Sequence, residues 1–371
     1  MIAPLQRQVV VFAGGGTGGH LFPGLAVARA LPTLEPVFLV PPDRGDAGRI
    51  GQEFRVVELD APRVDRAPWF FPARLALAVR RARRLLRELR ATAVVGLGGY
   101  ASVPGAVAAR SLGLPLYLIE CNAVPGRATR FLARFAAGIG LGAAQAQAAL
   151  PRGPRCRVTG TPLRGNLRAD AAKEEFGLEP TLPTLLVLGG SQGAAGLNTR
   201  VLEGLEACAP GAFQVLHCSG NRDAANVRAG YKSLDVPAAV VDFLPDIGRA
   251  YAVADLVLSR AGASTVAECA ALRRPAVFVP YPWHKDRQQV HNAWEAVRAG
   301  AARIVEEADL DPTMLKGIVH EILLDPEQRH RMAEAAHGIA RPEAAHDMAA
   351  HMVESFGAAL AEPQWNAEFG G

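Results

Sequence analysis

The chain enters its first half with the stretch Val9-Val10-Val11-Phe12-Ala13-Gly14-Gly15-Gly16-Thr17-Gly18-Gly19-His20, five apolar residues followed by a glycine-rich turn. At the matching place in the second half stands Leu185-Leu186-Val187-Leu188-Gly189-Gly190-Ser191-Gln192-Gly193-Ala194. Each stretch predicts a buried strand, a tight turn and the start of a helix, which directs backbone N–H groups and the positive helix end at an anion. Two such stretches predict a pair of Rossmann-like domains rather than a single nucleotide-binding domain.

Length and composition agree with two domains, each with a core of its own. The chain has 371 residues, half of them hydrophobic, and domains typically contain about 100–200 residues. Its five cysteines stand singly, which is typical of a reducing compartment rather than of a disulfide framework or a zinc knuckle. No apolar run reaches the roughly 18–20 residues that span a bilayer. Because a strand begins almost at once, we expect no signal peptide.

Short apolar runs alternate with helix-length segments, a pattern typical of parallel strands that are buried on both faces. The expected strands are Val9–Ala13, Val37–Val40, Val56–Leu59, Ala93–Leu97, Leu116–Glu120 and Ile139–Leu141 in the first half, and Leu185–Leu188, Phe213–Cys218, Ala239–Val241, Leu256–Ser259, Ala276–Pro280 and Ala302–Val305 in the second. The fold class is therefore α/β, with strands joined by right-handed crossovers.

The domain boundary is expected in the turn-rich stretch Thr159–Arg164, which a charged helix candidate at Ala169–Phe176 follows. The predicted domains are residues 1–161 and residues 162–340. Residues 341–371 are expected to form a C-terminal helix that packs back on the first domain, followed by a frayed tail around Glu362–Asn366.

The first glycine loop has more than one interpretation. Gly14, Gly16 and Gly19 match G-x-G-x-x-G formally, but a dinucleotide site also needs an acid after the second strand, where Asp43 is the only candidate. The loop can equally be a structural turn. His20 lies in the first turn of the following helix, where the helix end lowers the pKa of an imidazole and suits it to act as a general base. A capping or packing histidine is the alternative.

The second half holds a further candidate for anion binding. In Ser259-Arg260-Ala261-Gly262-Ala263-Ser264-Thr265-Val266-Ala267-Glu268, a strand end and a glycine turn lead into a helix that begins with small and hydroxyl residues. The Glu268 carboxylate can accept both hydroxyls of a ribose, or it can simply complement the helix dipole. A polar cluster, His284–Gln289, follows the next strand, at the strand end where such folds bind ligands.

Together these motifs resemble one family over residues 9–305. The motifs are GGGTGGHLFPGLA (14–26), GLGGYASVPG (96–105), IECNAVPG (119–126), GTPLR (160–164), GGSQGA (189–194), SRAGASTVAE (259–268) and HKDRQQ (284–289). Their order and spacing are similar to those of the MurG family of bacterial glycosyltransferases. The resemblance implies a GT-B fold, two Rossmann-like domains with parallel sheets facing a deep cleft, the first on the acceptor and membrane side and the second binding the UDP-sugar.

The resemblance also implies a reaction. It is the inverting transfer of N-acetylglucosamine from UDP-GlcNAc to the C4 hydroxyl of undecaprenyl-diphospho-muramoylpentapeptide, which converts lipid I to lipid II in peptidoglycan synthesis. No metal and no cofactor are implied. The one Asp-x-Asp of the chain, Asp309-Leu310-Asp311, is interpreted as a helix start because Pro312 follows it.

Carried over by position, His20 is the candidate catalytic base. The implied substrate-binding residues are Thr17, Gly18, Gly19, Asn122, Arg164, Ser191, Leu244, Ala263, Ser264, Thr265, Val266, Ala267, Glu268, Gln288 and Gln289. Among them Ser191 is expected to hold the diphosphate, Leu244 to meet uracil through its backbone, and the two glutamines to bind sugar hydroxyls.

Three stretches depart from the family pattern, namely Glu120–Asn122, Gly160–Arg164 and His217–Asn221. Cys121 stands where glutamine is usual and Thr161 where asparagine is usual, and both keep a small group in place. Asn221 stands where lysine is usual, which leaves no charge role at that position. The acceptor-binding residues are expected near Gly98-Gly99-Tyr100 and Gly126.

A basic and aromatic segment predicts contact with an anionic membrane surface. Pro68-Trp69-Phe70-Phe71-Pro72 precedes a helix with an apolar stripe of Leu75, Val79, Ala82, Leu86 and Leu89 and an opposite side of Arg80, Arg83, Arg84, Arg87 and Arg90. Such a helix can lie on anionic headgroups, although a crossover helix also needs one solvated face. The expected place is the cytoplasmic face of the plasma (inner) membrane, held peripherally. The basic run contains no recognised nucleic-acid module, so no nucleic acid is expected as a partner.

Other functions stay open at this point. A UDP-GlcNAc 2-epimerase, or another GT-B enzyme with the same donor, would share the fold but leave the basic and aromatic segment unexplained. A NAD-dependent oxidoreductase fits poorly with the second glycine loop and Glu268. A non-catalytic sugar-nucleotide sensor would leave His20 without a role.

Overall fold

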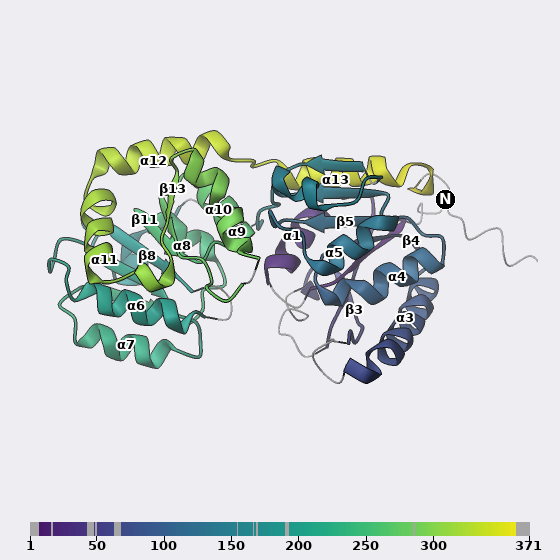
Figure 1. Cartoon of the computed structure of the whole chain (residues 1–371), viewed down its shortest axis with the longest axis horizontal. Helices are drawn as coiled ribbons and strands as arrows, with labels where there is room; N and C mark the ends of the chain where they lie inside the picture. Colours follow the sequence, from purple (N-terminus) through teal and green to yellow (C-terminus); the bar gives the residue numbers. More distant parts are fainter. Residues whose placement is uncertain are drawn as a thin grey trace, which may run out of the picture. The chain divides into compact units, whose positions relative to one another are not determined.

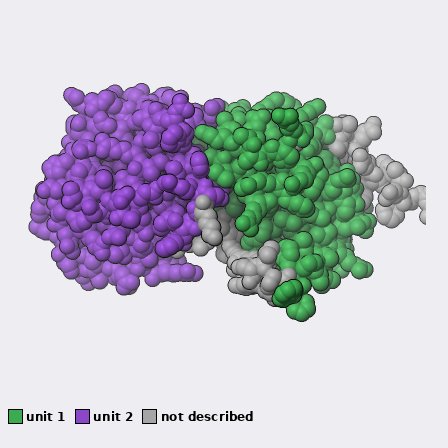
Figure 2. All heavy atoms as spheres, viewed as in Figure 1, with its two compact units in different colours: residues 1–164, 343–371 green, residues 165–342 purple. Residues whose placement is uncertain are grey.

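The computed structural model describes residues 7–360, except for residues 16–17, 43–47, 49, 63–67, 154, 166, 168–169, 190–192 and 285. The chain divides into two compact units (Figure 2). Unit 1 comprises residues 1–164 and 343–371, and unit 2 comprises residues 165–342. Each unit is an α/β layer structure around one parallel sheet (Figure 1).

Unit 1 contains a seven-stranded sheet with the order β3-β2-β1-β4-β5-β6-β7. Its strands are β1 Val9–Ala13, β2 Glu35–Val40, β3 Arg55–Glu58, β4 Ala91–Gly96, β5 Leu116–Glu120, β6 Gly138–Leu141 and β7 Arg155–Val158. Its α-helices are α1 Gly18–Arg29, α3 Phe71–Glu88, α4 Val103–Ser111, α5 Arg127–Leu132 and α13 Ala344–Phe356. The order reverses between β1 and β4, which makes this pair the topological switch point where α/β sheets bind ligands.

Alternate side chains of the strands in unit 1 pack into two hydrophobic cores, one on each face of the sheet. Val11 and Ala13 of β1 belong to a cluster that Ala82 and Leu86 of α3 complete, together with residues of α4 and α5. Val10 and Phe12 point to the opposite face, where α1 and α13 pack together. The C-terminal α13 thus covers the β5 and β6 side of the first sheet, although about 180 residues of unit 2 separate it from that sheet in the sequence (Figure 1).

Unit 2 contains a six-stranded parallel sheet with the order β10-β9-β8-β11-β12-β13. Its strands are β8 Thr184–Leu188, β9 Gln214–Cys218, β10 Ala238–Val241, β11 Leu256–Ser259, β12 Ala276–Phe278 and β13 Ala302–Ile304. Its α-helices are α6 Ala195–Leu205, α7 Ala224–Lys232, α8 Ile247–Val253, α9 Ala263–Ala271, α10 Gln288–Arg298, α11 Pro312–Ile318 and α12 Pro326–Ile339. Here the switch point lies between β8 and β11.

The sheet of unit 2 is buried on both faces. Leu185 and Val187 of β8 belong to the core beneath α6, α7 and α11. Leu186 and Leu188 belong to a second core with α8, α9, α10 and α12. The near-continuous apolar runs of the sequence follow from this double burial, because both sets of alternating side chains need apolar surroundings.

The predicted α/β class with two Rossmann-like, all-parallel sheets is confirmed. The expected strands are present with ends that differ by up to two residues, and β7 was not predicted. The charged helix expected at Ala169–Phe176 is wrong in its extent, since the described part forms only a 3₁₀ turn at Lys173–Phe176. The helix start at Asp311 is confirmed, because its carboxylate caps α11 by accepting the N–H of Met314 at 2.7 Å. The frayed tail at Glu362–Asn366 lies outside the described residues.

Candidate functional site

The candidate catalytic histidine lies at the switch point of unit 1. α1 begins at Gly18, directly after the glycine-rich turn of β1, and His20 falls in its first turn. The backbone N–H groups of this first turn have no partners within the helix, and the positive end of the helix dipole lies here. Of the neighbouring predicted residues, Gly18 and Gly19 open the same helix, whereas Thr17 lies outside the described residues.

The His20 ring rests against the backbone that follows β4. A Cβ atom on Gly98 would lie 3.2 Å from the imidazole Cδ2, and one on Gly99 would lie 3.6 Å from Cε1. Both glycines have positive φ, +83° and +68°, so a side chain at either position would be strained as well as crowded. The motif GLGGY therefore makes room for the imidazole. Burial lowers the pKa of His20, and the charge of Glu120 acts in the opposite direction, so the ring is neutral and able to accept a proton at pH 7.

Glu120 organises the next loop of unit 1. It is the last residue of β5 and is buried. One carboxylate oxygen accepts the backbone and side-chain N–H groups of Asn122 at 3.1 and 3.0 Å, and the other accepts the N–H of Gly126 at 3.1 Å. Because these contacts fix residues 121–126, Glu120 sets the position of the predicted substrate-binding Asn122.

Two of the departures from the family pattern, Cys121 and Thr161, are in contact. Burial raises the pKa of the Cys121 thiol, which makes a hydrogen bond with the side chain of Thr161. The paired change keeps the β5 loop attached to the segment that ends unit 1. At the end of that segment the Arg164 guanidinium lies over the Phe22 ring of α1, 4.3 Å from its centroid. This contact brings the predicted Arg164 to the helix that carries His20.

Unit 2 presents two strand–turn–helix corners on neighbouring strands. β8 leads through the second glycine loop into α6, and β11 leads through Gly262 into α9. Ser191 lies outside the described residues. The predicted run Ala263–Glu268 forms the first turns of α9. Within the part of the chain that is described, the buried hydroxyl of Ser264 has no hydrogen-bond partner, which suits a ligand atom at this helix start.

Glu268 is more enclosed than the sequence suggests. Its side chain is 1% exposed, and one carboxylate oxygen accepts the hydroxyl of Tyr251 on α8 at 2.9 Å. Tyr251, itself fully buried, thereby fixes the orientation of the carboxylate. Leu244, predicted to meet uracil, follows β10 and packs against the same core.

The polar segment after β12 is held from two sides. The Arg260 guanidinium donates to the carbonyls of Val279 and Pro280, both at 3.1 Å, and forms an ion pair with Glu307. The predicted sugar ligand Gln289 also has a structural contact, because its side-chain oxygen accepts the N–H of Tyr281 at 2.8 Å.

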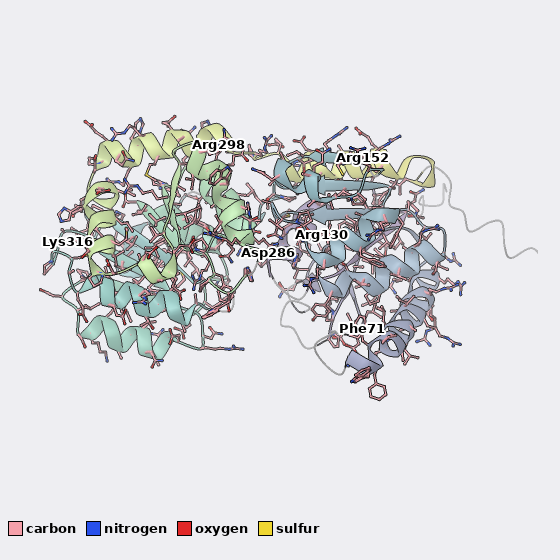
Figure 3. All side chains as sticks on the ribbon, viewed as in Figure 1. Phe71, Arg130, Arg152, Asp286, Arg298 and Lys316 are labelled. Carbon is pink, nitrogen blue, oxygen red and sulfur yellow. The ribbon has the colours of Figure 1, made fainter. Side chains whose placement is uncertain are left out.

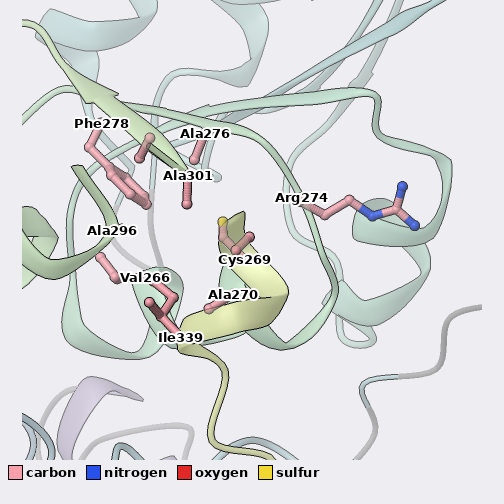
Figure 4. Close-up of a pocket in the computed structure, with 11 residues that line it drawn as sticks. Val266, Cys269, Ala270, Arg274, Ala276, Phe278, Ala296, Ala301 and Ile339 are labelled. Atoms are coloured by element: carbon pink, nitrogen blue, oxygen red, sulfur yellow. The ribbon is translucent and has the colours of Figure 1, made fainter. Parts of the chain in front are cut away.

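Gln288, the other predicted sugar ligand, is the first residue of α10, and its backbone N–H donates to the carboxylate of Asp286, the residue labelled in Figure 3, at 3.3 Å. Elsewhere in unit 2, α9, α10, α12 and β12 enclose a small apolar pocket of about 10 Å³ (Figure 4). Cys269, Phe278 and Ile339 are among its lining residues. It holds about one water molecule at most, so it is not a nucleotide site.

Sequence reasoning missed three residues that organise these corners: Glu120, Tyr251 and Arg260. Glu120 lies in the motif IECNAVPG and Arg260 in the motif SRAGASTVAE. A charged residue at the end of a buried strand could have indicated that each side chain has a buried partner. Tyr251 had no such signal, because its role depends on α8 packing beside α9.

Comparison with known proteins places the chain in a class. The model of the glycosyltransferase family 28 N-terminal domain matches residues 10–141, and that of the family 28 C-terminal domain matches residues 184–349. These segments contain both glycine loops and both switch points. The class is therefore that of the family 28 glycosyltransferases.

Curated relatives narrow the class. A "UDP-N-acetylglucosamine--N-acetylmuramyl-(pentapeptide) pyrophosphoryl-undecaprenol N-acetylglucosamine transferase" of Corynebacterium efficiens is 39% identical over 358 residues, covering 91% of this chain and 94% of the relative. The protein of the same name from Halorhodospira halophila is 39% identical over 353 residues, covering 92% and 96%. The chain belongs to this family, the MurG family.

Solved structures agree with this family and with its fold. The crystal structure of Acinetobacter baumannii MurG matches with a TM-score of 0.74 and 28% identity, covering 93% of this chain and 99% of that one. A putative UDP-N-acetylglucosamine 2-epimerase from Listeria monocytogenes matches with a TM-score of 0.70 at 14% identity, covering 96% and 98%. The second match reflects the shared fold alone.

Proposed function

We propose that this protein transfers N-acetylglucosamine from UDP-GlcNAc to the C4 hydroxyl of an undecaprenyl-diphosphate-linked muramoyl-pentapeptide. The observation that carries the proposal is the neutral His20 at the start of α1, enclosed by Gly98 and Gly99. The names of relatives about 39% identical over 91–92% of the chain give the same donor and acceptor. A 2-epimerase shares the fold but needs no acceptor, and the curated relatives with this identity carry the transferase name.

In the proposed mechanism unit 1 supplies the base and unit 2 holds the donor. His20 takes the proton of the acceptor C4 hydroxyl as its oxygen attacks the anomeric carbon of the sugar. The bond to the diphosphate breaks on the opposite face, so the configuration inverts and UDP leaves. The α6 and α9 helix starts, with the Ser264 hydroxyl, stabilise the negative charge on the leaving diphosphate.

The deciding experiment is incubation of the protein with radiolabelled UDP-GlcNAc and a lipid-linked muramoyl-pentapeptide. We expect label in the lipid product and one UDP released for each sugar transferred. UDP release that does not require the acceptor, with no labelled lipid, would contradict the transferase proposal and favour an epimerase-type reaction.

Glu268→Ala is expected to raise the KM for UDP-GlcNAc by about ten-fold, with kcat within about three-fold of the wild-type value. The reason is that the variant loses a carboxylate fixed by Tyr251, and one hydrogen bond from the ribose to a charged acceptor is worth about 1.5–3 kcal/mol, the lower end of which corresponds to about ten-fold. Initial rates at varied donor concentration measure the change. Tyr251→Phe, which keeps the carboxylate, should raise KM less. An unchanged donor KM in Glu268→Ala removes this residue from the ribose site.

We also propose that the protein lies peripherally on an anionic membrane, at the cytoplasmic face. No helix within the described ranges is long and apolar enough to span a bilayer. The support is the start of α3, where Trp69 and Phe70 are 92% and 68% exposed, next to Phe71 at the end of the helix in Figure 3. Exposed arginines, Arg80, Arg84 and Arg87, continue along α3, which suits contact with acidic headgroups.

A Trp69→Ala/Phe70→Ala variant should bind vesicles containing anionic lipid about ten-fold more weakly than the wild type, because two rings leave the headgroup region. Co-sedimentation with such vesicles, at low and at physiological salt concentration, measures the affinity of the variant and of the wild type for the membrane. Trp283→Ala is the matched control, since that tryptophan is also exposed (78%) but belongs to unit 2. Equal binding by the α3 variant and the control would contradict the proposed membrane surface.

A further inference from the structure

A chain of buried polar side chains lies beneath the second glycine loop. His217 on β9 is fully buried, and Asn198 on α6 is 1% exposed. The His217 Nδ1 lies 3.0 Å from the hydroxyl of Tyr231 on α7, and its Nε2 lies 3.0 Å from the Asn198 side-chain oxygen. The Asn198 amide nitrogen donates to the Ser219 carbonyl at 3.1 Å and to the Asp223 carboxylate at 2.7 Å.

The partners of Asn198 determine which atom donates and which accepts in every hydrogen bond of this network. The Ser219 carbonyl and the Asp223 carboxylate can only accept, so the Asn198 atom that faces them is the NH₂ group. The Asn198 oxygen must then accept from His217, which places the ring proton on Nε2. The unprotonated Nδ1 accepts the Tyr231 hydroxyl. Burial lowers the pKa of His217 to about 4, so this neutral form is the one present at pH 7.

The Ser219 end of this hydrogen-bonded network supports the described ends of the second glycine loop. The N–H of Gly189 donates to the Cys218 carbonyl at 3.3 Å. A Cβ atom on Gly193, whose φ is +77°, would lie 3.1 Å from the Ser219 carbonyl oxygen. Both described ends of the loop thus rest on residues 218–219. The Asn198 side chain ties this support to the first turns of α6, into which the loop leads.

We propose that His217 and Asn198 are positioning residues that hold the start of α6, together with Gly189 and Gly193 at the described ends of the second glycine loop, in place for the diphosphate of the nucleoside diphosphate-sugar. The proposal rests on the function proposed above. A helix start binds a diphosphate well only if its N–H groups are already aimed, because ordering them on binding costs affinity. His217 orients the Asn198 amide, and Asn198 joins the Ser219 carbonyl to α6. Loss of either side chain should therefore weaken UDP binding more than it slows the chemical step.

The test uses the full chain and UDP as the probe, titrated by calorimetry. His217→Leu should raise the Kd for UDP by about ten-fold, in line with a lost buried hydrogen bond. His217→Gln, whose amide N–H can still reach the Asn198 oxygen, should recover most of the affinity. Tyr231→Phe is the matched control: it removes a buried hydroxyl but leaves the His217–Asn198 bond, so Kd should stay within about two-fold despite a lower Tm.

Asn198→Ala provides the second line if His217→Leu does not fold. It should raise the Kd for UDP by a similar factor. The double variant should bind UDP no more weakly than the weaker-binding single variant, because each substitution interrupts the same hydrogen-bonded network. In turnover assays the donor KM should rise while kcat at saturating donor stays within about three-fold. Folded His217→Leu and Asn198→Ala variants that bind UDP with the wild-type Kd would overturn the positioning role. A wild-type chain that does not bind UDP would overturn the proposed function instead.

Discussion

Replacement of His20 by alanine is expected to lower kcat by about 10²–10⁴-fold, the usual contribution of a positioned general base, and to leave the Kd for UDP within about two-fold. The large effect is expected because the ring stands at the start of α1 with its pKa lowered by burial, so it is neutral where the reaction needs a base. UDP affinity should hold because the donor is assigned to unit 2.

The proposed role of His20 as a base also predicts how kcat/KM depends on pH. The base must be unprotonated, so kcat/KM should fall on the acid side as His20 takes up a proton. Since burial lowers its pKa from the ordinary 6.5, that fall should lie below pH 6.5, with a plateau at neutral pH. Steady-state rates between pH 4.5 and 8.5 measure both effects, with His346→Ala of the exposed α13 pair as the control. Near-normal turnover in the His20 variant would remove it from the mechanism.

The sequence was sufficient for the repeated strand–turn–helix units, because strands buried on both faces leave long apolar runs. It was insufficient for β7, where Arg155-Cys156-Arg157-Val158 alternates charged and apolar residues, as an edge strand with one solvated face does. The burial of Glu268 was likewise beyond reach, since its carboxylate is closed in by Tyr251, seventeen residues away on another helix.

The second glutamine shows a further limit. Gln289 was assigned to the sugar as a family ligand, and the structure adds a contact to the Tyr281 backbone that no sequence pattern encodes. Loop-supporting contacts of this kind depend on where one segment closes upon another. Sequence motifs therefore predict candidate ligand-binding groups, whereas the contacts that hold these groups in place come only from the structure.

Glu120 is the clearest of these supporting groups, and Glu120→Gln is expected to lower kcat/KM by about 10- to 100-fold at neutral pH. The amide is nearly isosteric but neutral, and its NH₂ end cannot accept one of the N–H groups from Asn122 and Gly126. The loop of residues 121–126 would lose part of its support. His20 would also lose the negative charge that favours its protonated form, so it becomes a weaker base and a less stabilised imidazolium.

The pH profile separates the electrostatic effect of Glu120 from a purely structural one. The carboxylate raises the pKa of His20 against the effect of burial, so its removal should move the acid fall of kcat/KM to lower pH while the plateau drops. Glu120→Asp, which keeps the charge, should leave the midpoint close to the wild-type value even if the shorter side chain loosens the loop. Glu53→Gln is the matched control in unit 1, because it removes a carboxylate paired with Arg29 at the opposite end of α1. A reduced plateau with an unmoved midpoint in Glu120→Gln would show that the carboxylate only fastens the loop and that its charge does not act on His20.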